Sequence, residues 1–430
     1  MLGGGSFISQ SEKRLPGSYI NFVSAAKVSA SLAERGYVAV PMILDWGVDG
    51  DVFTVTSGDF YKNSRAIFGY DYAHEKMKNL RDLFMYAETA YIYKLGTGAV
   101  KASCEFATAT YAGTRGNSLR IVIAETTEAY EVSTYLDLVL VDTQFVNQAS
   151  ELVDNDFVTF NSEAQLAETA SMPLIGGVDG TVDSGSWQEA LDALGAYSFN
   201  VIGAATTDDS VKKLVAEWTK MMRDDVGVKF QAVVYDYAAD DKAVINVVSK
   251  PKDGAECDLV YWVAGAEAGC KVNASLTNKV YNGEYDVDVK VSQVRLVEAL
   301  DKGEFIFHRV GDDARVLEDI NSKVTVSIDE NEDFKSNQTI RVIDQVAMDI
   351  ASMFNTRYLG IVPNDNAGRI SLWNDIVKHH QEMMQVRAIE GYEPEHTTVE
   401  QGDTKKSVIV NDMITPVNAM AQMFMTVVVA

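Results

Sequence analysis

The sequence has few of the residues that mark secreted, disulfide-stabilised or disordered chains. Its 430 residues include three cysteines, Cys104, Cys257 and Cys270, and their spacing fits no metal-binding motif. A small, odd number of cysteines is typical of a reducing compartment, so we expect buried free thiols. With only 7 Pro and 30 Gly, the composition excludes a collagen-like chain and argues against disorder.

Basic residues are also scarce. Lys and Arg number 37 against 62 Asp and Glu, which gives a formal net charge of −25. A surface this acidic repels phosphate backbones, and the sequence has no basic stripe interleaved with aromatic residues. We therefore predict no nucleic-acid partner, and we expect the charge to keep the free chain soluble.

Long apolar runs are missing as well. No stretch of about 18 apolar residues exists, so we predict neither a transmembrane helix nor a membrane partner. Residues 1–10 are Gly-rich and lack the basic and apolar regions of a signal peptide. The sequence thus predicts a cytosolic product.

The nucleotide-binding and nucleophile motifs are absent, namely Gly-x-Gly-x-x-Gly, the Walker A loop and Gly-x-Ser-x-Gly. The nearest Gly-rich segment, Gly176–Gly180, precedes a predicted helix but has no suitably placed Lys. We interpret it as an ordinary loop, with phosphate binding as the alternative. No catalytic residue and no cofactor is predicted.

Two acidic or histidine-containing segments could suggest a metal site. Asp329–Asp333 begins like an EF-hand loop, but Phe334 and Ile340 stand where that loop needs Gly and Glu. His379 and His380 are adjacent, whereas a ligand pair on a helix needs a spacing of three or four, so we expect them on different helix faces. We predict a solvated acidic turn and no metal.

What the sequence does contain is enough apolar material for several cores. Hydrophobic residues make up 47% and charged residues 23%. At about 100–200 residues per domain, the length indicates two to four domains. The hydrophobic patterns predict an α+β multidomain fold with an α/β core, a β-sandwich or barrel insert, and extended terminal arms.

The expected organisation follows the chain in six parts. Alternating or continuous apolar runs indicate strands at 36–40, 90–95, 199–202, 230–235 and 324–328. Helical periodicity indicates helices at 208–222, 260–268, 338–358 and 371–391, and one that begins at Ser186, the expected N-cap, with Glu189 completing a capping box. The six parts are an N-terminal arm (1–22), an N-terminal α/β domain (23–95), a β-rich peripheral domain (96–175), a central α/β domain (176–300), a C-terminal α+β domain (301–410) and a C-terminal arm strand (411–430).

The two ends of the chain have strand character but no obvious local partner. Tyr19 to Phe22 alternates like a strand, and residues 418–429 form an apolar ending. Segments of this kind suit β-augmentation, in which main-chain hydrogen bonds to another chain supply the affinity. The residues that we predict to make contacts between subunits are Tyr19, Ile20, Phe22, Val408, Val410, Phe424, Thr426, Val427, Val428 and Val429.

Several stretches, in order along nearly the whole chain, resemble the sheath proteins of contractile bacteriophage tails, of the kind found in phages of Gram-positive hosts and in R-type bacteriocins. Trp262–Gly269 and Asn273–Tyr281 are the most specific matches. The Asp329–Asn337 loop departs from the family pattern. The remaining stretches that carry the resemblance are Leu15–Phe22, Ala90–Leu95, Tyr111–Asn117, Tyr197–Ile202, Asp208–Asp225 and Phe424–Val429.

This resemblance implies a structural subunit and no enzyme. Sheath subunits form hexameric rings stacked helically around a tail tube, their arms add strands to neighbouring subunits, and contraction drives the tube through a bacterial envelope. The implied partners are further copies, the tube protein, and baseplate and tail terminator proteins. The implied location is a virion tail or bacteriocin particle assembled in the host cytoplasm.

Two other functions stay open at this point. The 176–300 segment could carry a hydrolase-like enzyme, which would need a concave pocket with converging titratable groups. The chain could also be a monomeric binding module. Arms that project from a folded body would favour the sheath instead.

Overall fold

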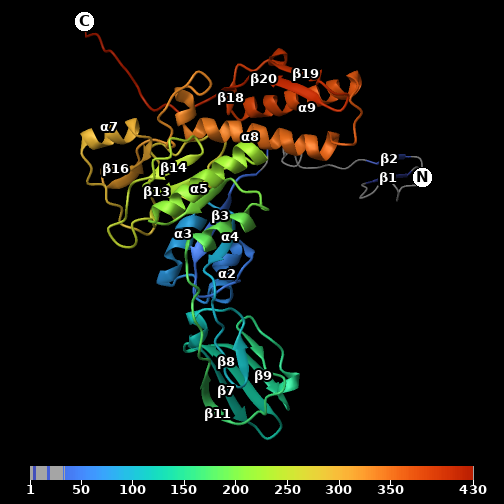
Figure 1. Ribbon diagram of the computed structural model, residues 1–430, viewed down its shortest axis with the longest axis vertical. Coiled ribbons are helices and arrows are strands. Elements are labelled where there is room, and N and C mark those ends of the chain that lie inside the picture. Colours follow the sequence, from blue (N-terminus) through green and yellow to red (C-terminus); the bar gives the residue numbers. More distant parts are fainter. Residues whose placement is uncertain (1–2, 6–16, 20–31, 33, 430) are drawn as a thin grey trace. The chain divides into compact units, whose positions relative to one another are not determined.

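The computed structural model describes residues 3–5, 17–19, 32 and 34–429 (Figure 1). Ile20 and Phe22, two of the predicted arm contacts, lie outside these residues. The chain divides into two compact units, which are described separately below. The smaller unit comprises residues 1–34 and 342–417, and the larger comprises 35–341 and 418–430.

A seven-stranded sheet forms the centre of the larger unit. Its strand order is β15-β14-β13-β12-β3-β5-β4, and only β4 runs antiparallel to its neighbour. Sheets that are buried on both faces need continuous apolar strands, and every residue of β12, β13 and β14 is buried. The strands are β3 (Tyr37–Ile43), β4 (Val52–Thr56), β5 (Thr89–Leu95), β12 (Val201–Ala204), β13 (Gln231–Tyr235), β14 (Val244–Val247) and β15 (Glu304–Phe305).

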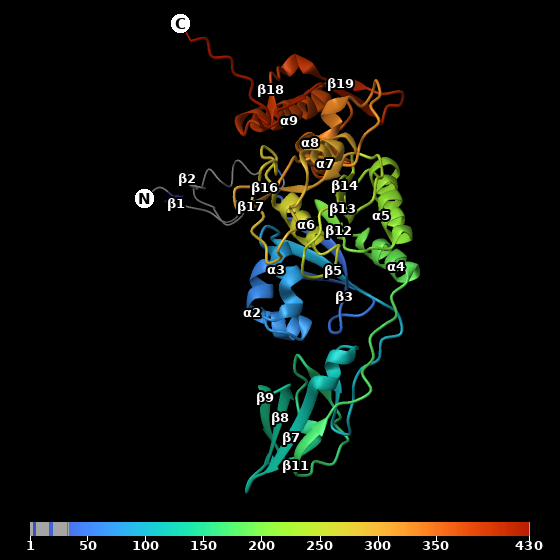
Figure 2. The ribbon, with the colours of Figure 1, turned by 90° about the vertical axis from the view of Figure 1, so that its left-hand side faces the viewer.

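Helices cover both faces of this sheet (Figure 2). On one face, Val38 and Ile92 share a core with Trp262 of α6 and Leu80 of α3. On the other, Tyr93 belongs to a core that α4 and α5 complete. The helices are α2 (Ser57–Phe68), α3 (Lys78–Phe84), α4 (Ser184–Leu194), α5 (Asp209–Met221) and α6 (Leu259–Gly269).

Close packing between α6 and α3 depends on a glycine. A Cβ added to Gly265 would lie 2.2 Å from the carbonyl oxygen of Leu83. Almost all of α6 is buried, as is usual for a helix that is apolar on every side. The small-residue helix predicted at 260–268 is therefore confirmed, and its small residues allow the approach of α3.

A β-sandwich is inserted between β5 and α4. A four-stranded sheet in the order β11-β7-β8-β9 and the pair β10-β6 enclose a core that contains Trp46, Phe106, Leu119 and Ile121. The strands are β6 (Ala107–Ala109), β7 (Leu119–Glu125), β8 (Tyr130–Leu136), β9 (Val139–Val146), β10 (Val158–Phe160) and β11 (Thr169–Pro173).

The last part of the larger unit contains α7 (Gln293–Asp301) and a short hairpin of β16 (Phe307–Val310) and β17 (Asp313–Val316). Helix α8 (Asn337–Met353) begins in this unit and continues into the smaller one. The predicted strand at 324–328 is wrong, because these residues form an irregular and largely exposed segment. Asp240 instead accepts hydrogen bonds from the amides of Val324 and Thr325.

The described part of the smaller unit contains the end of α8, helix α9 and three short strand pairs. After α8 the chain makes one π-helical turn, η7 (Phe354–Tyr358), and then forms α9 (Asn366–Gln385). The pairs are β1 (Gly3–Gly5) with β2 (Gly17–Tyr19), β18 (Ile389–Glu390) with β21 (Thr415–Pro416), and β19 (Thr397–Gln401) with β20 (Val408–Asp412).

The start of α4 corrects another prediction. Asp183 is the N-cap, and its side chain accepts a hydrogen bond from the amide of Ser186 at 2.9 Å, while Ser186 completes the capping box. Ser186 was expected to be the cap itself. Asp and Ser both suit an N-cap, and the carboxylate three residues upstream takes the position.

Candidate intersubunit surface

The β19–β20 hairpin is a largely exposed two-stranded sheet of the smaller unit. Its strands pair antiparallel from Thr397 opposite Asp412 to Gln401 opposite Val408. Within the described part of the chain this sheet has two strands only, so each strand keeps one edge without a ladder partner. A free edge presents a row of main-chain donors and acceptors that can pair with another chain.

Helix α9 packs against the β19–β20 hairpin. The Nε1 atom of Trp373 donates a hydrogen bond to the carbonyl oxygen of Thr397 at 2.8 Å. Leu372 and Ile376 form a small core with Tyr358, and Val408 packs against it. The hairpin is thus fixed to α9, and within the described residues the outer edge of β20 has no ladder partner.

Two buried histidines connect α9 to the hairpin and to α8. The Nδ1 atoms of His379 and His380 lie 3.1 Å apart. His379 Nε2 is 2.9 Å from Asp349 of α8, and His380 Nε2 is 2.5 Å from Asp412 of β20. The sequence predicts the two histidines on different helix faces. Their Nε2 atoms do reach different elements, but both residues are buried and their Nδ1 atoms meet.

Hydrogen bonds hold Asp412 in its ionised form. Burial alone would raise its pKa, but hydrogen bonds from His380 and Thr397 outweigh burial and lower the pKa below the usual value. The two rings thus form a continuous hydrogen-bonded network from Asp349 of α8 to Asp412 of β20.

The C-terminal segment, residues 418–429, is apolar but exposed. It has no charged residue and no regular secondary structure, and Phe424 is 91% exposed. In the described structure no hydrogen bond is found beyond Ala419. The large apolar side chains that are exposed here are Met420, Met423, Phe424, Met425, Val427, Val428 and Val429.

The base of this segment is fixed to the start of α8. Asn418 Nδ2 donates to Thr339 Oγ1 at 3.0 Å, and Ser336 Oγ donates to Asn418 Oδ1 at 3.2 Å. The amide of Ala419 donates to Gln338 Oε1 at 2.9 Å. These contacts set the point at which the apolar segment leaves the larger unit.

The structure thus places the predicted contact residues in three settings. Tyr19 ends β2. Val408 and Val410 lie in β20, where Val408 is partly buried and Val410 is 37% exposed. Thr426 lies with the other predicted tail residues in the exposed segment 418–429. Sequence patterns missed Asp349 and Asp412, since partners that come from separate elements leave no local signal.

The Gly-rich loop 176–180 and the acidic turn 329–333, which were considered as phosphate and metal sites, make contacts within the protein instead. The amide of Gly177 donates to Asn117 and that of Val178 to the carbonyl of Val100, so neither is available for a phosphate. In the acidic turn, Glu330 forms ion pairs with Lys242 and Lys323. The described residues include no group of metal-ligating side chains and no helix long and apolar enough to cross a membrane.

Comparison with known proteins assigns the chain in three consecutive parts. Residues 96–179 match the phage tail sheath protein beta-sandwich domain, 180–322 the phage tail sheath protein central domain, and 329–430 the phage tail sheath C-terminal domain. The chain is therefore a structural tail component. It belongs to the phage tail sheath protein family, so the resemblance seen in the sequence is confirmed.

Relatives cover nearly the full length. The chain is 30% identical to the phage-like element PBSX protein XkdK of Bacillus subtilis, over 99% of both chains. The crystal structure of a sheath tail protein from Desulfitobacterium hafniense is 31% identical, with a TM-score of 0.81, covering 94% of this chain and 97% of that one. The contracted helical sheath of the anti-feeding prophage has a TM-score of 0.56 at 13% identity, covering 97% and 99%, and shares the fold.

Proposed function

We propose that copies of this chain stack as hexameric rings around a tail tube and contract to drive the tube through a bacterial envelope. The observation that carries this proposal is the uncharged apolar segment 418–429, which extends from a folded body with its side chains exposed. An isolated soluble protein rarely leaves so many adjacent large apolar side chains in water. A neighbouring copy would cover them.

In this proposal the terminal arms connect the copies. The C-terminal segment adds a strand to the free edge of a neighbour's β19–β20 hairpin, and residues 1–22 contribute in the same way. Main-chain hydrogen bonds give this pairing its strength. The contacts would involve Tyr19, Ile20, Phe22, Val408, Val410, Phe424, Thr426, Val427, Val428 and Val429.

The reach of the arm supports this arrangement. Twelve extended residues span at most about 40 Å, enough to cross onto another molecule. Contacts of this head-to-tail kind generate rings or helices, depending on whether the rotation closes. A contracting assembly also needs two packings of similar energy. Strand-bearing arms would keep the copies connected while the bodies change partners.

The six parts of the chain would then have separate roles. Residues 176–300 and 301–410 would form the body of the sheath, and the insert 96–175 would lie at its periphery. The assembly would contact a tube protein, a baseplate and a terminator, and would form in the host cytoplasm as part of a phage tail or bacteriocin. We assign the chain no catalytic role, and nothing favours the hydrolase.

Electron microscopy of the purified full-length chain tests this proposal. Rings, rods or tubes at high protein concentration are the expected result. Size-exclusion chromatography at the same concentrations gives the complementary reading. A protein that stays strictly monomeric at all concentrations, and also when tube protein is added, would contradict it.

A further inference from the structure

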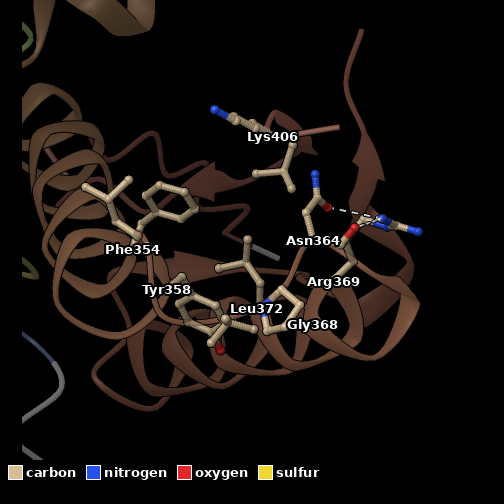
Figure 3. Close-up of a pocket in the computed structure, with 12 residues that line it drawn as sticks. Phe354, Tyr358, Asn364, Gly368, Arg369, Leu372 and Lys406 are labelled. Carbon is tan, nitrogen blue, oxygen red and sulfur yellow. Dashed lines mark hydrogen bonds between the residues drawn. The ribbon is translucent and has the colours of Figure 1, made fainter. Parts of the chain in front are cut away.

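A small pocket opens in the smaller unit between η7, the start of α9 and the hairpin (Figure 3). It has a volume of about 100 Å³. Phe354, Leu372 and Val408 line its apolar part, and Arg369 and Lys406 stand at its polar side. Cofactor and drug sites usually measure roughly 300–1,000 Å³, so this pocket is better matched to a single side chain.

The walls of the pocket are tied together before any occupant binds. Asn364 Nδ2 donates to the carbonyl oxygens of Lys405 and Ser407, which joins the loop before α9 to the turn of the hairpin. Arg369 Nη1 donates to Asn364 Oδ1 at 3.1 Å. A Cβ on Gly368 would lie 2.1 Å from the carbonyl of Pro363, so glycine permits this closure.

An exposed apolar residue lies in the lining of the pocket. Leu359 is 59% exposed, and Ile361 and Ile370, next to lining residues in the sequence, are also exposed. Exposed apolar side chains near an apolar pocket suit a protein contact. The π-helical turn in the wall points the same way, since such turns are frequent at functional sites.

One segment of the chain has the chemistry to fill the pocket. Residues 418–429 carry no charge, their apolar side chains are exposed, and Phe424 is the bulkiest of them. An apolar occupant fits the part of the pocket that Phe354, Leu372 and Val408 line, and it brings no charge of its own into that part. Residues 1–22 are less suitable, because they contain Glu12, Lys13 and Arg14.

We propose that the pocket receives the side chain of Phe424 from a second copy of this chain. This inference rests on the proposed function and deepens it. Strand addition alone fixes neither position nor register along an edge, because main-chain hydrogen bonds are the same at every residue pair. A phenyl ring seated in the pocket would select one register for the arm.

Photo-crosslinking tests this directly in the full-length protein. Benzoylphenylalanine is placed at position 424, and these copies are mixed with isotopically heavy copies that lack it. We expect crosslinks from residue 424 of light chains to heavy peptides that contain residues 354–372. Crosslinks only within one chain, or only to other regions, would overturn the proposal.

Two charge variants and two matched controls provide a second test. Leu359→Asp and Phe424→Asp should each raise the protein concentration needed for polymers on the order of tenfold, because one buried apolar contact is lost. Ile328→Asp and Leu138→Asp change exposed apolar side chains that lie outside the pocket and outside the arm, and should have little effect.

These results separate the pocket from the arm. If deletion of 418–430 abolishes polymers while Leu359→Asp and Phe424→Asp leave them unchanged, the pocket proposal fails and the arm proposal stands. If that deletion changes nothing, the arm proposal fails as well. All four variants alter exposed residues, and circular dichroism confirms that each is folded.

Discussion

Arg341 of α8 and Glu267 of α6 form an ion pair in the interior of the larger unit, with Nη2 and Oε2 2.5 Å apart. Asp319 lies 3.3 Å from the same nitrogen, and Asn337 donates to both carboxylates. All three charged side chains are almost fully buried. One guanidinium therefore faces two carboxylates, and a shared proton relieves the repulsion between them.

The buried pair predicts that stability falls as pH rises from the acid range to about pH 8. Burial, together with the charge of Asp319, raises the pKa of Glu267 from 4.5 to about 8. Between these two values the folded chain keeps a proton that the unfolded chain has released, so the stability that is fully present below the unfolded value is lost as pH rises to the folded value. Denaturant unfolding should show a free energy that declines between about pH 5 and pH 8, with a limiting slope of about 1.4 kcal/mol per pH unit, and that levels off above pH 8.

Glu267→Gln is the matched variant for this prediction, because it keeps the shape and removes the titration. Its unfolding free energy should vary less between pH 5 and 8 than that of the unmodified chain. An equally steep decline in both proteins would show that another group is responsible.

The contact between α6 and α3 predicts a sharp penalty for one methyl group. Gly265→Ala should destabilise the larger unit by about 1–3 kcal/mol, because the added Cβ meets the backbone of Leu83. Gly58→Ala in α2 is the control, since nothing but Thr56 Oγ1 lies within 4 Å of its Cβ. Thermal unfolding should show the control unchanged or slightly stabilised. Equal effects of the two changes would refute the packing argument.

The histidine network predicts that the hairpin depends on His380. His380→Ala should destabilise the smaller unit by on the order of 2–4 kcal/mol, since it leaves a cavity and removes the closest donor to Asp412. The fluorescence of Trp373, which contacts the hairpin, could report its unfolding once the other tryptophans are replaced. Asn411→Ala, an exposed neighbour on β20, should change little. A comparable loss at Asn411 would count against the network.

The terminal arms are expected to be needed for assembly and not for folding. Deletion of residues 1–20, or of 418–430, should abolish polymers and leave a folded monomer. For the C-terminal deletion the reason is that the exposed side chains of 420–429 contribute little to a core. Light scattering and calorimetry give the two readings. Loss of the cooperative unfolding transition in the truncated protein would contradict this prediction.

Hydrophobic patterns in the sequence predicted the helices and strands in which buried residues recur at regular spacing or form a continuous run. The helix expected at 208–222 is α5, and the strand expected at 199–202 is β12, because amphipathic or fully apolar runs determine them. The strand expected at 324–328 does not form. The main-chain amides of Val324 and Thr325 donate to the Asp240 carboxylate and not to a neighbouring strand.

The candidate site was predicted less completely than the fold. The apolar C-terminal segment could be recognised from composition alone, because no charge interrupts it after Asp412. The pocket and the histidine network could not be, since Asp349, His379 and Asp412 come from three separate elements. Only the packing of α8, α9 and β20 brings such groups together.

A cryo-EM map of the assembled particle at side-chain resolution tests the central claim most directly. The account predicts density for residues 420–429 of one copy, paired as a strand with the edge of a neighbour's β19–β20 hairpin. Arms that fold back on their own copy, or that end in solvent while the particle stays intact, would contradict it.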